Sequence, residues 1–129
     1  MSNEIDGWPI IYSYTRKQAI EDGVLIDVTA QAKEAGFKVP VAIGDNLFHR
    51  YVTPPFGLEG EGQSIDGRLY DLFIMTHAAI HCQRGESRLL FCVLFLMKPR
   101  RTEKVRVLAV VGPGDEGGLV MTICLPEDE

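Results

Sequence analysis

The sequence predicts an α+β fold in which one long helix packs against an antiparallel sheet of at least three strands. Residues 65–84 place apolar side chains on one arc of a 3.6-residue period, which is typical of an amphipathic helix. Three β-rich runs follow at residues 88–97, 103–111 and 119–125. The connections between these runs are short, and short connections join antiparallel neighbours.

The long helix has clear boundaries in the sequence. Ser64 is placed to cap its first turn, and Gly85 ends it. The side chains predicted to face the sheet are Ile65, Leu69, Leu72, Phe73, Thr76 and Ile80. Those predicted to lie outside this arc are Arg68, Asp71, His77 and His81.

The N-terminal half predicts short helices separated by turn signals. Thr15 and Gln18 match a capping box, and Gly23 ends the helix that they begin. Thr29 is expected to cap a second helix, and Asp45 a third. These short helices are expected at residues 15–22, 30–35 and 45–52. Short extended segments are expected at residues 10–14, 24–28 and 39–43, and an irregular segment at 53–63.

Length and composition predict a single domain covering residues 1–129. The hydrophobic fraction of 46% is ordinary for a globular protein. Three cysteines without a CxxC spacing do not suggest a disulfide framework. No secretory signal is visible, and the apolar run at residues 89–97 is too short to span a bilayer as a helix. We therefore expect a cytoplasmic protein without a membrane partner.

The charge distribution argues against non-specific nucleic-acid binding. The formal net charge is −5, whereas binding to phosphates requires positive charge. Despite the negative net charge, one local basic patch lies at the connection between the predicted strands at residues 88–97 and 103–111. It consists of Lys98, Arg100, Arg101 and Lys104, with Arg106 nearby. We interpret it as a solvated hairpin tip, and contact with nucleic acid or an acidic protein surface is the alternative.

No complete catalytic motif is present, and no cofactor is implied. His77 and His81 form an HxxxH pair on the long helix, but position 78 is alanine and His49 is the one candidate for a third metal ligand. We interpret both histidines as solvated, with a metal site as the alternative. The glycine-rich segment 112–118 joins two strands and lacks the Lys-Ser/Thr of a phosphate loop, so a hairpin turn explains it.

Four segments resemble a family of small uncharacterised proteins found on bacterial plasmids and other mobile elements. The segments are YTRKQAIEDGVLIDV at residues 14–28, AKEAGFKVPVA at 32–42, DGRLYD at 66–71 and the stretch beginning GPGDEG at 112. Tyr70 stands where that family usually has tryptophan. The resemblance implies a bacterial or phage cytoplasmic setting and supplies no reaction mechanism.

Some charged motif residues are not explained by helix capping. These are Arg16, Asp22, Arg68 and Asp71. They are predicted either to form a structural ion network between the two halves or to line a ligand-binding cleft, to which Asp27 and His77 would also contribute. We favour the structural network.

The sequence therefore favours a non-catalytic protein-interaction or regulatory module of a mobile element. A small enzyme or small-ligand binder is the first alternative, with its site between the N-terminal motif and the long helix. A nucleic-acid-associated protein that uses the basic hairpin is the second. The strands at Leu89 and Val105 are both candidate edges for pairing with a second copy.

Overall fold

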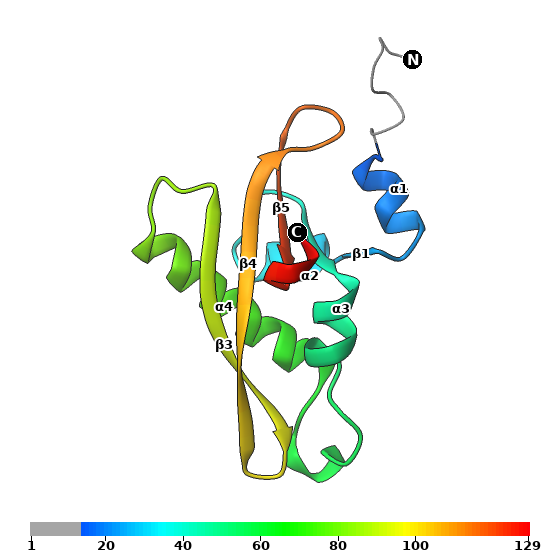
Figure 1. Ribbon diagram of the computed structural model, residues 1–129, viewed down its shortest axis with the longest axis vertical. Coiled ribbons are helices and arrows are strands. Elements are labelled where there is room, and N and C mark those ends of the chain that lie inside the picture. The colour runs from blue at the N-terminus through cyan, green and yellow to red at the C-terminus, as the bar shows by residue number, and fades with distance from the viewer. Residues whose placement is uncertain (1–13) are drawn as a thin grey trace.

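The computed structural model describes residues 14–129, which form an α+β structure around one five-stranded sheet (Figure 1). The sheet has the order β1-β2-β5-β4-β3. Its strands are β1 (Leu25–Asp27), β2 (Val41–Gly44), β3 (Arg88–Lys98), β4 (Arg101–Pro113) and β5 (Leu119–Cys124). The predicted strand at residues 10–14 falls almost entirely outside the described residues.

Among residues 14–129, one helix is long and the others are short. The α-helices are α1 (Arg16–Glu21), α2 (Thr29–Glu34), α3 (Asp45–Leu47) and α4 (Ile65–Cys82). A π-helix, η2 (Phe48–Val52), continues α3, and 3₁₀ turns lie at η3 (Glu59–Glu61) and η4 (Pro126–Asp128). The 18-residue helix α4 begins where the sequence predicts and ends two residues earlier.

The α+β class and an antiparallel ladder of three strands are confirmed, but the sheet as a whole is mixed rather than antiparallel throughout. Strands β3, β4 and β5 form an antiparallel ladder, and β1 is antiparallel to β2. Strand β2, however, runs parallel to β5, with Val41 opposite Met121 and Ile43 opposite Ile123. The long connection from β2 to β5 allows this parallel pairing. The prediction rested on the short connections between the C-terminal strands, which do not indicate how β2 pairs.

Local sequence signals position the first helix well and the second imperfectly. Thr15 and Gln18 form the predicted capping box, and Gly23 adopts a φ of 79° after the helix. Thr29 is the first residue of α2 rather than its cap. Val28 is the cap and makes no side-chain hydrogen bond, but Asp27 Oδ1 satisfies the first helical N–H by accepting from the Thr29 N–H at 3.0 Å, and it also accepts from the Thr29 hydroxyl at 2.6 Å.

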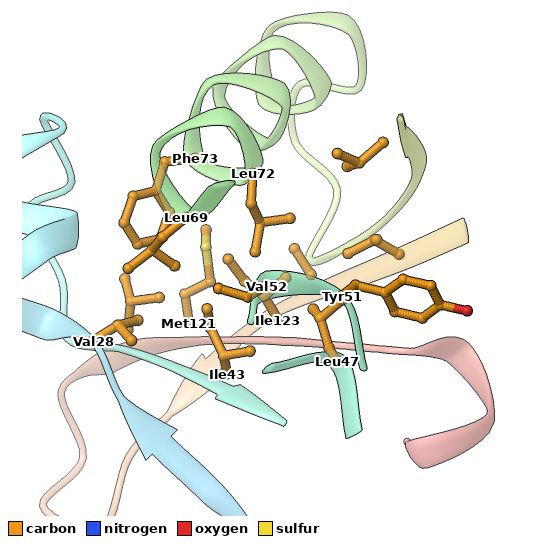
Figure 2. Close-up of a cluster of buried hydrophobic side chains, with 14 of the residues drawn as sticks. Val28, Ile43, Leu47, Tyr51, Val52, Leu69, Leu72, Phe73, Met121 and Ile123 are labelled. Atoms are coloured by element: carbon orange, nitrogen blue, oxygen red, sulfur yellow. The ribbon is translucent and has the colours of Figure 1, made fainter. Parts of the chain in front are cut away.

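The core lies between the sheet and α4 (Figure 2). In β3, β4, β5 and β2, the odd-numbered residues face this core, as the strand period of two requires. From α4, the predicted Leu69, Leu72, Phe73 and Thr76 are buried, whereas Ile65 is 40% exposed.

The prediction that Arg68 lies outside the buried arc is wrong. Its side chain is only 3% exposed. Its Nε donates to the Tyr51 carbonyl at 2.8 Å, and its Nη1 donates to Gln63 Oε1 at 2.8 Å and to the Leu96 carbonyl at 2.7 Å. The guanidinium also lies over the Phe95 ring. Arg68 is thus a buried cation whose charge is solvated mainly by carbonyl oxygens from three different segments.

We predict that Arg68→Ala destabilises the fold by about 3 kcal/mol, because it leaves buried acceptors without donors and removes packing. Urea unfolding at neutral pH measures this change. The exposed Arg84 provides the matched control, and Arg84→Ala is expected to stay within about 0.5 kcal/mol of wild type. Equal effects of the two substitutions would contradict the role assigned to Arg68.

Candidate functional site

The first candidate site is built where α1 meets the loop between β4 and β5. Asp115 lies in that loop and accepts hydrogen bonds from the backbone N–H groups of Arg16 at 2.9 Å and Lys17 at 3.0 Å. These N–H groups belong to the first turn of α1 and have no partner within the helix. Together they lower the pKa of Asp115. A residue 99 positions away therefore holds the start of α1.

The loop that carries Asp115 is fixed by its glycines. The Gly114 N–H donates to the Gly118 carbonyl at 2.7 Å, and the Gly117 N–H donates to the Gly114 carbonyl at 3.1 Å. A Cβ atom on Gly114 would lie only 2.8 Å from Val120, and Gly117 has a φ of 88°. The predicted hairpin turn is therefore correct, and it also positions a carboxylate.

The Arg16 side chain joins α1 to the sheet. Its Nη1 donates to Thr122 Oγ1 at 2.6 Å and its Nη2 donates to the Met121 carbonyl at 2.7 Å. Partial burial lowers the pKa of Arg16, while the charges of Asp27 and Asp115 raise it. Two carboxylates thus offset the cost of placing this cation against β5.

Asp22 and Asp27, which the sequence groups with Arg16, take local roles. The Tyr14 hydroxyl donates to Asp22 Oδ2 at 2.6 Å, and this bond raises the pKa of Tyr14. Asp27 accepts a hydrogen bond from the first N–H of α2 and also borders the same groove as Arg16. The sequence-predicted residues Arg16 and Asp27 are therefore brought together, with Asp22 at the far end of α1.

A groove of about 780 Å³ lies between α1, the start of β2 and the β4–β5 loop. Four apolar residues contribute to its walls: Ile20, Pro40, Leu119 and Val120. Its charged residues are Arg16, Lys17, Glu21, Asp27, Asp115 and Glu116. Leu119 is 59% exposed, so an apolar side chain is presented to solvent among charged neighbours.

Arg68 and Asp71 do not join this groove. Arg68 is buried in the core contacts described above, and the nearby Asp71 carboxylate opposes the lowering of its pKa by burial. Asp71 itself is exposed. The five charged motif residues therefore separate into a group at α1 and a group on α4, and they do not converge on one cavity.

A second pocket, of about 440 Å³, lies between α2 and α4. Its polar groups include Glu34 and Asp66, and its aromatic walls are Tyr70 and Phe73. This is the general position that the sequence suggests for a ligand, between the N-terminal motif and the long helix. The residues that line it were not the predicted ones, because their side chains converge only when α2 packs across α4.

The two histidines of α4 have different surroundings. His77 is half-buried and stacks on Phe37 with ring centroids 4.1 Å apart, so the prediction that it is a solvated surface residue is wrong. Its Nε2 lies 2.9 Å from the Ala35 carbonyl and must carry the proton, since a carbonyl only accepts. His81 is exposed, and its Nδ1 lies 3.1 Å from Arg84. Within residues 14–129, no group of three or more His, Cys, Asp or Glu side chains is arranged to hold a metal ion.

The predicted basic patch lies where β3 turns into β4. Lys98, Arg100, Arg101 and Lys104 are all exposed there. Arg100 occupies the turn with a φ of 60°. Figure 1 shows this hairpin extending away from the rest of the sheet, at the opposite end from the β4–β5 loop.

The fold is that of an α+β protein with a mixed sheet. Its short helix α1 is held against this sheet by hydrogen bonds of the charged residues Arg16 and Asp115. The whole chain, residues 1–129, matches one family model, and the protein belongs to this family of unknown function (DUF6573). No curated protein and no solved structure gives a significant match. In the part of the chain that the structure describes, no helix is long and apolar enough to cross a membrane.

Sequence reasoning missed Asp115 and Leu119 as groove residues. Asp115 stands in the Gly-Pro-Gly-Asp segment, which a hairpin turn explains without any further role. The sequence offered one signal. The first N–H groups of α1 need more acceptors than the capping box supplies, and the Asp115 carboxylate lies in a loop where it can accept.

We predict that Asp115→Ala loosens α1 from the sheet. Because the pKa of Asp115 is lowered in the folded protein, its stabilising effect is complete above the unfolded value of about 4 and is lost as the pH falls below it. Amide hydrogen exchange in α1 should therefore be faster in the variant at pH 7, and unfolding experiments should show the stability difference shrinking in acid.

The neighbouring Glu116→Ala is the matched control for this prediction, because no hydrogen bond from the Glu116 side chain is recorded among the described residues. It should leave exchange in α1 unchanged. Identical exchange in the wild type and the Asp115 variant would show that the loop does not hold the helix.

Proposed function

We propose that the protein is a non-catalytic protein-interaction module that binds a partner segment in the groove between α1 and the β4–β5 loop. The observation that carries this proposal is the exposed Leu119 beside Ile20 and Pro40, with charged side chains around them. Exposed apolar surface rimmed by polar residues is typical of interaction sites.

The charged groups of the groove already make hydrogen bonds that hold the fold together, and this supports a binding role over a catalytic one. Asp115 accepts two backbone hydrogen bonds, and Arg16 donates to Thr122 and to a β5 carbonyl. Groups that fix the fold in this way hold the walls of the groove in place. The groove is lined by four carboxylates and two cations, so it favours a partner segment that combines an apolar side chain with positive charge.

The resemblance of the motifs to proteins of plasmids and other mobile elements suggests the setting. We place the protein in the bacterial cytoplasm, where an acidic groove would bind and block a basic surface of a host protein. The net charge of −5 supports attraction of such a partner.

We predict that Leu119→Asp abolishes partner binding, because it places a carboxylate where an apolar side chain must dock. The measurement is affinity capture from a bacterial host lysate with purified wild-type and variant protein. Ile74→Asp is the matched control, since Ile74 is an exposed apolar residue of α4 that does not line the groove. The expected result is a partner retained by wild type and the control and lost with Leu119→Asp.

Two outcomes would count against the groove. One is the absence of any specific partner, and the other is a partner held equally by all three proteins. Circular dichroism of the variants confirms that each is folded before binding is compared.

The pocket between α2 and α4 favours a second candidate function, the binding of a small cationic ligand. Glu34 and Asp66 supply negative charge and Tyr70 an aromatic face, which together suit an amine or guanidinium group. We predict that spermidine at low ionic strength raises the melting temperature of the wild type and has a smaller effect on Glu34→Gln. Glu61→Gln, a carboxylate outside this pocket, is the control. No shift, or equal shifts in all three proteins, would remove this function.

A further inference from the structure

Strand β3 forms one edge of the sheet and carries an unusual amount of apolar surface. It is 11 residues long, and its nine residues from Leu89 to Met97 contain no charge. Natural edge strands are commonly short, charged or covered, because an open apolar edge pairs readily with another strand. Figure 1 shows β3 on the outer side of β4, and within residues 14–129 no strand lies beyond it. The alternative edge at Val105 is excluded, since β4 lies between β3 and β5.

The register with β4 decides which backbone groups point outward. The Ser87 carbonyl accepts the Val111 N–H at 2.8 Å, so the odd-numbered residues of this ladder exchange hydrogen bonds with β4. The N–H and C=O groups of the even-numbered residues therefore face the open edge.

Side chains near the two ends of α4 cover this edge at two places. Gln83 Nε2 donates to the Leu90 carbonyl at 3.1 Å, and Arg68 Nη1 donates to the Leu96 carbonyl at 2.7 Å. Between them, Cys92 and Leu94 have no recorded hydrogen-bond partner on the open side within residues 14–129. The uncovered part of the edge is therefore centred on Val93.

The sequence of β3 is nearly symmetric about the same residue. Reading outward from Val93, Phe91 matches Phe95, Leu90 matches Leu96, and Leu89 matches Met97. When a strand pairs with a copy of itself in antiparallel orientation, each residue faces the residue at the same distance on the other side of the centre. A strand with a nearly symmetric sequence therefore places similar side chains opposite one another. The midpoint of the strand, the centre of its symmetry and the uncovered window all coincide at Val93.

From this coincidence we infer that β3 pairs with β3 of a second copy of the chain, antiparallel and centred on Val93. A two-fold axis then gives an isologous interface, the commonest kind in homo-oligomers. The N–H and C=O groups of Cys92 meet those of Leu94 of the second copy, and this happens twice, so that the four backbone groups of these two residues in each strand are used. The two sheets become one continuous ten-stranded sheet.

The side chains support the same register. On the face opposite α4, Leu94 is 63% exposed and Leu90 is 44% exposed. In the paired sheet, each of these leucines gains an apolar neighbour, Cys92 or Leu96, from the second copy. At the strand ends Arg88 comes opposite Lys98, and the ion pair between Arg88 and Glu129 places a negative charge beside these two cations. This inference is independent of the groove at α1.

The test uses disulfide formation to read the register. The background is the variant Cys82→Ser, which removes the exposed cysteine. In this background, the further substitution Leu94→Cys places a cysteine directly opposite Cys92 of the second copy. The two Cα atoms then lie within the separation that a disulfide requires. Mild oxidation should therefore give a covalent dimer on non-reducing gels. Leu90→Cys in the same background is the matched control, because position 90 lies opposite Leu96 and should give little cross-linking. Cys82→Ser alone should likewise remain uncross-linked.

Sedimentation of the unmodified wild-type protein over a concentration series provides the second measurement. We expect a monomer–dimer equilibrium that Leu94→Lys shifts at least tenfold toward monomer while the circular dichroism spectrum is unchanged. Wild-type protein that stays monomeric throughout, or cross-linking that is as strong with Leu90→Cys as with Leu94→Cys, would overturn the proposed pairing. Leu119→Asp should leave the dimer intact, so failure of the groove and failure of this edge are distinguishable.

Discussion

The parallel pairing of β2 with β5 is the constraint on which the rest of the structure depends. It places Val41 and Ile43 beside Met121 and Ile123 in the core and joins the N-terminal half of the chain to the last strand. Burial of these apolar side chains supplies the stabilisation, since none of the short helices before β2 is long enough to be stable alone. Once β2 is fixed, α1 and α2 are held against opposite faces of the same sheet.

Charged residues then join segments that are far apart in the chain, both at the surface and inside the protein. Asp115 and Arg16 hold α1, each by bonding backbone or hydroxyl groups of a distant segment. Arg68 does the same inside the protein, where it draws η2, the loop before α4 and β3 together. Both arginines are satisfied mainly by oxygens that carry no full charge, which is why sequence spacing of acids and bases does not reveal their partners.

The two proposed interaction surfaces lie in different parts of the sheet. The groove at α1 borders the β4–β5 loop, whereas the open edge is the middle of β3. Pairing through β3 therefore leaves the groove accessible and would present two copies of it on one assembly. A partner with two binding segments would then be held more tightly than one groove allows, because the second contact forms within the same complex.

Hydrophobic periodicity and capping residues by themselves determined the α+β class, the start of α4, the capping box of α1 and the three C-terminal strands, because these features depend on neighbours within a few residues. Only the tertiary structure decided the parallel β2–β5 contact, the burial of Arg68, the stacking of His77 on Phe37 and the role of Asp115. Each of these joins residues far apart in the chain, and local patterns do not specify which distant segment supplies the partner. The candidate groove belongs to this second group, since its walls come from α1, the start of β2 and the β4–β5 loop.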